Sequence, residues 1–204
     1  MRTRRLIVLA ALAALTASCT TTHTVAPPPP PAPVDHSTWS GNPTTPFRAP
    51  SFVLPDQNGH ATGVAAERGK VVLLTFLYTR CPDACPLIAS RISTALELLA
   101  PSARSHVRVL AVSVDPEHDT PTAVARFIRE HRLGPQFHYL VGSRNRLRPI
   151  WQAYNVLATP RNDQAIDHSA FTTIIDRRGM VRSYFAPTAP ATGIAHDVRR
   201  ALGL

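Results

Sequence analysis

Two cysteines separated by three residues have the greatest capacity for chemistry in this sequence. Cys81 and Cys85 stand in the segment CPDACP, shortly after an apolar run that ends at Tyr78. Thiolates attack disulfides and bind soft metal ions, and a structural disulfide is a third use for such a pair. A disulfide that closes so short a loop restricts the unfolded chain little. The spacing therefore predicts a dithiol redox site or a metal site, with the structural disulfide as the alternative.

A buried strand followed by a helix must position the two thiols. The run KVVLLTFLY, residues 70–78, is continuously apolar, which is typical of a strand buried on both faces. Residues 87–100 carry apolar side chains at helical spacing, and Cys85 is in phase with them. We therefore expect Cys85 to lie under the helix and Cys81 to be more exposed on the preceding loop. The helix N-terminus and the neighbouring Arg80 are expected to lower the pKa of both thiols.

The rest of the pattern predicts an α/β domain of the thioredoxin-like type. Asn58-Gly59 marks the turn of an N-terminal β-hairpin. Further strands are predicted at residues 107–114, 137–141, 172–175 and 180–185. Helices are predicted to begin at Pro121, behind an N-cap at Thr120, and to span residues 144–154 and 194–202. This order of elements favours a central mixed sheet with helices on both faces.

The first 46 residues differ in composition from the rest. Residues 1–18 have a basic start, a short apolar stretch and then small residues, which is typical of a secretory signal and too short for a membrane-spanning helix. The segment TASC, residues 16–19, resembles a bacterial lipobox, so Cys19 is expected to carry lipid, with ordinary signal cleavage nearby as the alternative. Residues 19–46 are rich in Thr and Pro and predict a stiff tether. Residues 47–204 are then the folded domain.

These features predict an exported protein that is anchored to the cell membrane by lipid on Cys19, with its domain facing the periplasm or the cell exterior. The cysteine count agrees, because assigning one of the three cysteines to lipid leaves Cys81 and Cys85 as a pair. The formal charge of +9 does not favour nucleic-acid binding, since three arginines lie within the first five residues and aromatic residues make up 6% of the chain.

Three motifs, in this order, resemble those of the Sco/SenC family. They are FLYTRCPDACP at residues 76–86, VSVDPEHDTP at residues 112–121, and Asp167-His168-Ser169. The resemblance implies a thioredoxin-like fold, copper binding, and a role in assembling the binuclear copper centre of cytochrome c oxidase subunit II. It implies Cys81, Cys85 and His168 as ligands of Cu(I) or Cu(II), and that subunit or another copper acceptor as the partner.

Some members of this family are instead, or also, thiol-disulfide oxidoreductases that keep the copper-binding cysteines of the oxidase reduced. In that case Cys81 is the attacking thiolate, Cys85 resolves the mixed disulfide, and a thiol reductant is a further partner. Redox thioredoxins resemble one another in placing a cis-proline where this sequence has His168, and an imidazole at that place favours a metal over general disulfide exchange. A copper chaperone without turnover is the first hypothesis, and the oxidoreductase is the second.

Three further residues are candidates to tune the site. Asp167 could orient the imidazole of His168, although an exposed carboxylate is an equal alternative. Asp115, at the carboxyl end of the neighbouring strand, could approach the same site or simply form an Asp-Pro turn. Arg80 could adjust the electrostatics. His118 stands where the family commonly has arginine, and we interpret it as a polar loop residue.

Overall fold

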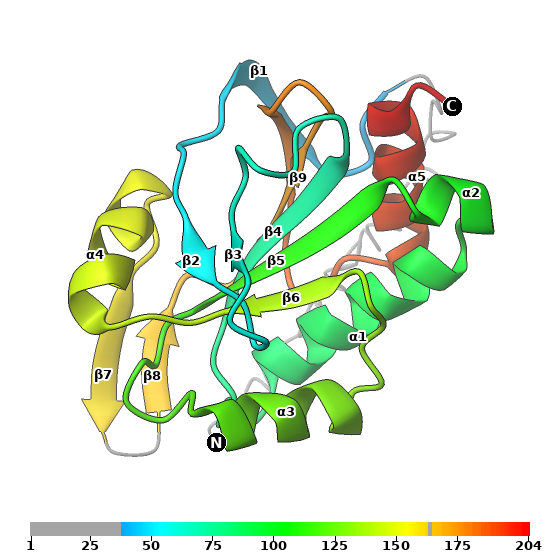
Figure 1. Ribbon diagram of the computed structural model, residues 1–204. Helices are drawn as coiled ribbons and strands as arrows, with labels where there is room; N and C mark the ends of the chain where they lie inside the picture. Colours follow the sequence, from blue (N-terminus) through cyan, green and yellow to red (C-terminus); the bar gives the residue numbers. More distant parts are fainter. Residues whose placement is uncertain (1–37, 163–164) are drawn as a thin grey trace, which may run out of the picture. The chain divides into compact units, whose positions relative to one another are not determined.

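A six-stranded mixed sheet lies at the centre of the computed structural model, which describes residues 38–162 and 165–204 (Figure 1). In the order β1-β10-β9-β4-β5-β6, β4, β5 and β6 run parallel and each of the other three runs antiparallel to its neighbours. The strands of this sheet are β1 (Asn42–Arg48), β4 (Val71–Leu77), β5 (Val107–Ser113), β6 (Phe137–Leu140), β9 (Thr172–Ile175) and β10 (Met180–Phe185). Two small hairpins stand apart from it: β2 (Leu54–Pro55) with β3 (Ala61–Thr62), and β7 (Ala158–Asn162) with β8 (Ala165–His168).

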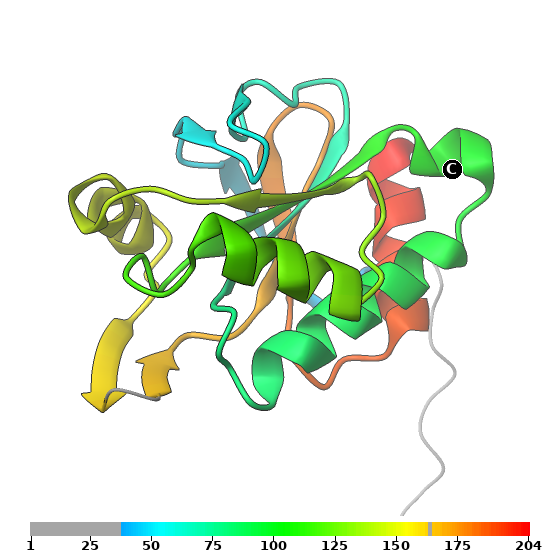
Figure 2. The ribbon, with the colours of Figure 1, turned by 60° about the horizontal axis from the view of Figure 1, so that its bottom comes forward.

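The described part of the chain also contains five helices, which are α1 (Ala84–Glu97), α2 (Pro101–Arg104), α3 (Pro121–Glu130), α4 (Arg144–Ala153) and α5 (Ala191–Leu202). The connections β4-α1-β5 and β5-α3-β6 step toward the same edge, so right-handed crossovers place α1 and α3 on the same face. Helix α5 packs against α1, and Figures 1 and 2 show the three helices together on one side of the sheet. The predicted thioredoxin-like α/β architecture is confirmed.

The parallel strands β4 and β5 form the core of the sheet. All seven residues of β4 are buried, and in β5 only Arg108 is partly exposed. Both faces of these two strands are covered, which explains why their sequences are almost continuously apolar instead of alternating. The ring of Phe76 on β4 lies 5.7 Å from that of Tyr154, just after α4. Burial of both strands and this ring contact therefore restrict the movement of their carboxyl ends.

Helix α1 begins at Ala84, three residues before its predicted start at Leu87. The carboxylate of Asp83 accepts a hydrogen bond from the backbone N–H of Ala84 and so caps the helix. Pro86 is compatible with this early start because the first-turn N–H groups of a helix have no partner within the helix. Cys85 consequently lies inside the first turn of α1.

Strand β1 includes residues 42–46, which are the last five residues of the segment predicted as a tether. It pairs antiparallel with β10, and the register shifts between Pro43 and Phe47. An edge strand tolerates proline, since one side of it makes no ladder hydrogen bonds. This strand was not predicted because its segment is rich in proline. It forms by pairing with β10, which lies more than 130 residues away in the sequence.

The hairpin of β7 and β8 was not predicted, and its short strands carry no alternating apolar pattern. It is antiparallel, with Ala158 opposite His168. The predicted signal peptide, Cys19 and most of the predicted tether lie outside the described residues, so they stay predictions. Within residues 38–162 and 165–204, no helix is both long and apolar enough to cross a membrane.

Candidate metal centre

The two thiols lie where β4 leads into α1. Cys81 lies in the turn after β4, and Cys85 is the second residue of α1. Their exposed fractions are 7% and 0%, so Cys85 is the more buried, as predicted, while Cys81 is buried as well. The backbone N–H of Cys85 donates to Sγ of Cys81 at 3.3 Å. Neither cysteine is in a disulfide.

His168 approaches the thiols from the end of β8. Its Nε2 lies 3.6 Å from Sγ of Cys85, and its Nδ1 lies 3.3 Å from the carbonyl oxygen of Ser169. A carbonyl only accepts hydrogen bonds, so the second contact requires the proton on Nδ1. The lone pair of Nε2 then faces the thiols. The ring of Tyr78 meets the imidazole edge-on, with centroids 5.4 Å apart, which restricts its rotation.

Cys81, Cys85 and His168 form a group that could hold one metal ion. Their ligand atoms all lie within 4.8 Å of one another. Ligand atoms at about 2.0–2.3 Å from one ion stand ~3.5–4 Å apart, so the group needs only a small contraction to close around a metal. Two thiolates and one imidazole are a soft donor set, which suits copper, whereas structural zinc usually takes four protein ligands.

The two thiols have opposite electrostatic character. The hydrogen bond from the Cys85 thiol is the largest cause that lowers the pKa of Cys81, and contacts with His168 and with the backbone of Asp83 and Cys85 add to it against the effect of burial. Burial, followed by the hydrogen bond and the charge of Cys81, raises the pKa of Cys85. The expected lowering is confirmed for Cys81 and wrong for Cys85. The pair is arranged as a thiolate beside a thiol.

Two of the predicted tuning residues, Arg80 and Asp115, form an ion pair with each other. The guanidinium of Arg80 donates to the carboxylate of Asp115 at 2.9 Å, and Nδ1 of His118 lies 2.8 Å from the same carboxylate. Asp115 also forms the expected turn, because its carbonyl oxygen accepts from the backbone of His118 and Asp119. Asp115 thus ties the loop before Cys81 to the loop after β5. The side chain of Asp167 lies outside the described part of the structure.

Comparison with known protein families agrees with this arrangement. The family model described as SCO1/SenC matches residues 42–203. The chain belongs to the SCO1/SenC family. The SCO2-like protein RP587 of Rickettsia prowazekii is 31% identical to it over 140 residues, which are 66% of this chain and 67% of the relative.

Two solved structures of Sco proteins resemble the described fold. Apo Sco1 from Thermus thermophilus is 29% identical, with a TM-score of 0.70, and the match covers 80% of this chain and 96% of that one. ScoI from Bradyrhizobium japonicum, solved with copper bound, is 31% identical, with a TM-score of 0.64, and the match covers 76% of this chain and 100% of that one. The thioredoxin-like fold of the SCO1/SenC family is therefore present here.

Sequence reasoning missed a buried acid beside the thiols of this SCO1/SenC chain. Asp119 is 5% exposed, and its carboxylate accepts hydrogen bonds from the backbone N–H of Thr79 and from the hydroxyls of Ser113 and Tyr139, at 2.6–2.9 Å. Burial raises its pKa, and its negative charge contributes to raising that of Cys85. Its position shortly after a buried strand could have marked Asp119 as a site residue. The following Thr120-Pro121 instead indicated the start of a helix, and Asp119 was not considered further.

Tyr78 was interpreted only as the last residue of an apolar strand. Burial is the largest cause that raises its pKa to about 12, and the neighbouring charge of Cys81 adds to this. The phenol is therefore neutral at any physiological pH. Beside the edge-on contact with His168, its hydroxyl lies 3.5 Å from the backbone N–H of Ile166, so Tyr78 connects the strand before the thiols to the strand that carries the imidazole.

We expect iodoacetamide to alkylate Cys81 of the reduced, metal-free SCO1/SenC chain already at pH ~6. An ordinary thiol, with a pKa of about 8.5, hardly reacts at that pH. The lowered pKa of Cys81 keeps it as a thiolate at that pH. Peptide mass spectrometry over a pH series measures the rate at each cysteine. Cys85, which is fully buried, is expected to stay unmodified. A rate at Cys81 that rises through pH ~8.5 would contradict the assignment.

Proposed function

We propose that this chain is a copper chaperone that delivers copper to the binuclear centre of cytochrome c oxidase subunit II. Cys81, Cys85 and His168 hold the ion as cargo. Three protein ligands leave a coordination position to which a thiolate or imidazole of an acceptor can bind before the first ligands leave. The membership in the SCO1/SenC family supports this role.

One observation carries the proposal: two thiols and an imidazole, from segments 83 residues apart, converge with their ligand atoms within 4.8 Å. The orientation of His168 adds support, because its Nδ1 contact leaves Nε2 directed at the thiols. Both thiols are free, as copper binding requires. A soft site with two sulfurs and one nitrogen accommodates either Cu(I) or Cu(II).

The proposal includes an export route and an anchor. Residues 1–18 direct the chain out of the cytoplasm, and lipid on Cys19 holds it at the membrane. The segment between Cys19 and strand β1 separates the domain from the anchor; some 22 residues at about 3.1 Å each extend to ~70 Å as polyproline II. The domain then works on the outer side of the membrane, within reach of a membrane-bound oxidase.

The second candidate function, a thiol-disulfide oxidoreductase, is favoured by the unequal thiols. The Cys81 thiolate attacks a disulfide of the substrate and forms a mixed disulfide, while one substrate sulfur leaves as a thiolate and takes up a proton. Cys85 then loses its proton and attacks Sγ of Cys81, which releases the reduced substrate and leaves the Cys81–Cys85 disulfide. A thiol reductant returns the pair to the reduced state.

A His168→Ala variant separates the two functions. We expect it to lose copper stoichiometry and copper transfer, because one of three ligands is gone, while its dithiol still reduces a disulfide substrate. Anaerobic copper titration measures the first property, and reduction of an oxidised acceptor peptide measures the second. His60→Ala is the matched control, since that side chain is 80% exposed and lies outside the three-ligand group. Unchanged copper stoichiometry in His168→Ala would contradict the ligand assignment.

A further inference from the structure

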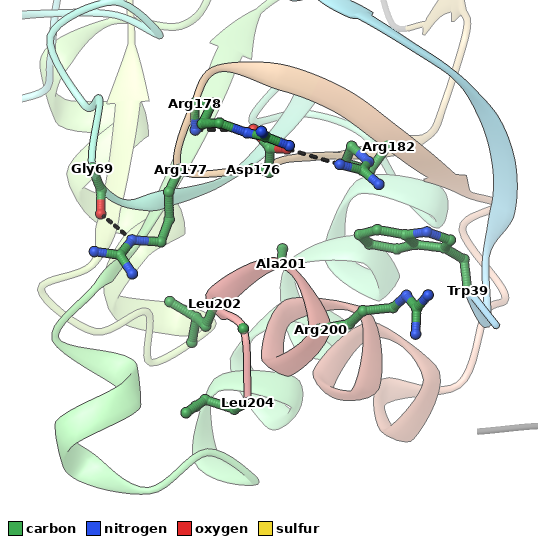
Figure 3. Close-up of a pocket in the computed structure, with 11 residues that line it drawn as sticks. Trp39, Gly69, Asp176, Arg177, Arg178, Arg182, Arg200, Ala201, Leu202 and Leu204 are labelled. Carbon is green, nitrogen blue, oxygen red and sulfur yellow. Dashed lines mark hydrogen bonds and ion pairs between the residues drawn. The ribbon is translucent and has the colours of Figure 1, made fainter. Parts of the chain in front are cut away.

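A basic pocket of about 790 Å³ (Figure 3) lies at the end of the sheet where β4 begins. The thiols follow the other end of that strand. Residues from the turn between β9 and β10, from the end of α5 and from the chain just before β1 surround it. Four arginines and one tryptophan are among them: Arg177, Arg178, Arg182, Arg200 and Trp39. The proposed copper function uses none of these residues.

Three of these arginines are held in place by their surroundings. The guanidinium of Arg182 lies 5.0 Å from the centre of the Trp39 ring, and that of Arg200 lies 5.4 Å from it. Figure 3 shows the ring between the two guanidinium groups. Nε of Arg177 donates to the carbonyl oxygen of Gly69 at 3.0 Å. Ordered guanidinium groups bind an anion without first losing side-chain freedom, and their planar N–H edges match phosphate oxygens.

The acidic groups in the pocket are too few to neutralise it. Asp176 forms an ion pair with Arg182 at 3.0 Å, and Arg178 lies 3.9 Å from the same carboxylate. Four guanidinium groups against this one carboxylate leave three positive charges, and a free carboxylate at Leu204, which also lines the pocket, would still leave two. An anionic ligand would therefore be attracted.

An apolar pocket of about 550 Å³ adjoins the basic one, because Trp39 lines both. Phe185, Ala189 and Pro190 are among its apolar lining residues, and His196 and Arg199 are among its polar ones. A ligand that spans the two pockets must carry an anionic part and an apolar part. Free phosphate offers only the first, whereas an anionic phospholipid offers both.

We propose that the basic and apolar pockets, which share Trp39 as a lining residue, form a docking site for the headgroup and upper acyl chain of an anionic phospholipid. The anionic headgroup lies in the basic pocket against the guanidinium groups that line it, those of Arg182 and Arg200 among them, and the acyl chain contacts Phe185. Tryptophan and arginine side chains suit this interface, since the first prefers the boundary between headgroups and hydrocarbon and the second binds phosphate. The inference is independent of copper binding.

The predicted anchor raises the effective concentration of lipid at this site. Trp39 follows Cys19 by 20 residues, so it stays within ~70 Å of an anchored N-terminus even if the segment is fully extended. A domain docked through the basic pocket would direct the carboxyl end of β4, with Cys81 and Cys85, away from the membrane surface. An acceptor site above the membrane could then reach the metal centre.

Quenching of Trp39 by lipid tests this proposal. The full chain is combined with vesicles that contain brominated acyl chains, made either of phosphatidylcholine alone or of phosphatidylcholine mixed with phosphatidylglycerol. The chain has two tryptophans, and the other, Trp151, is 4% exposed, so subtracting the signal of a Trp39→Phe variant isolates Trp39. We expect quenching that requires phosphatidylglycerol and decreases with added salt.

Arg182→Gln combined with Arg200→Gln is expected to lower the affinity for vesicles that contain phosphatidylglycerol. The expected loss is about fivefold for each arginine removed, since a basic residue at an anionic surface contributes ~1 kcal/mol. Arg200→Gln alone keeps the measurement decisive if the double variant is unstable, because Arg200 has no carboxylate partner among the described residues. Arg126→Gln with Arg129→Gln, two exposed positions on α3, is the control with the same net charge.

Equal quenching on both kinds of vesicle would overturn the proposal, as would an equal loss in the α3 control, which would mean general attraction of a basic protein to an anionic surface. Inorganic phosphate that competes in the millimolar range more strongly than sodium chloride at equal ionic strength would also overturn it, because the site would then bind the free anion. A loss confined to the Arg182 and Arg200 variants would support it.

Discussion

A Cys85→Ser variant is expected to bind copper more than ~100-fold more weakly than the native chain. The loss of a partner that merely supports a ligand costs about 10–100-fold, and removing a ligand itself should exceed that. Sγ of Cys85 is fully buried and lies 3.6 Å from Nε2 of His168, so a serine hydroxyl at this place offers a hard donor in a site built for a soft ion. Anaerobic competition titration with a Cu(I) chelator measures the affinity, and absorption reports the thiolate-to-Cu(II) charge-transfer band.

Ser90→Ala is the control for this variant, since it changes an exposed residue of the same helix. We expect its copper affinity and its absorption band to match those of the native chain. Native-like copper affinity in Cys85→Ser would show that Cys85 is not a ligand, and the three-residue site would have to be abandoned.

An Asp119→Ala variant is expected to lose ~2–4 kcal/mol of unfolding free energy. The buried carboxylate accepts hydrogen bonds from the backbone of Thr79 and from the hydroxyls of Ser113 and Tyr139, and its removal leaves these donors without their acceptor. The network also joins β5 and β6 to the segment that precedes Cys81. Chemical denaturation measured by far-UV circular dichroism gives the free energy. A loss below ~0.5 kcal/mol, the usual effect of a surface substitution, would contradict the importance of this network.

Asp119→Asn distinguishes the hydrogen bonds from the charge. Burial raises the pKa of Asp119 above its ordinary value of 3.8, so the folded chain holds this proton more tightly than the unfolded chain. The contribution of the carboxyl group to stability is therefore complete below pH ~4 and is lost as the pH rises through the raised pKa of the folded state. Because asparagine stays neutral, the stability of the native chain relative to Asp119→Asn should fall over that pH range. A relative stability that rises with pH would contradict a raised pKa.

Most of the fold was predictable because local pattern determines it. The continuous apolar run of β4 indicated a strand covered on both faces, and Thr120-Pro121 marked the start of α3. Gly179, with a φ of 79°, allows the turn between β9 and β10 at the place the sequence indicated. Strand β1 and the hairpin of β7 and β8 escaped prediction, because proline and polar residues in them obscure the alternation that identifies a strand.

The sequence by itself determined the chemical type of the site. Two thiols with this spacing between a buried strand and a helix, and a histidine in a motif that resembles the Sco/SenC pattern, already limited the choice to copper binding or disulfide chemistry. These are properties of short segments, and neighbours in the chain decide them. The match to the SCO1/SenC family model confirms the family resemblance that these motifs indicated.

Only the tertiary structure decided how these groups act on one another. It brought Nε2 of His168 to 3.6 Å from Cys85 across 83 residues of chain, and it buried Asp119 where its charge raises the pKa of one thiol. It also placed Arg182 and Arg200 on either side of Trp39, which the sequence separates by more than 140 residues. Distances, desolvation and charge coupling depend on which distant segments pack together, and a linear pattern of residues contains none of these quantities.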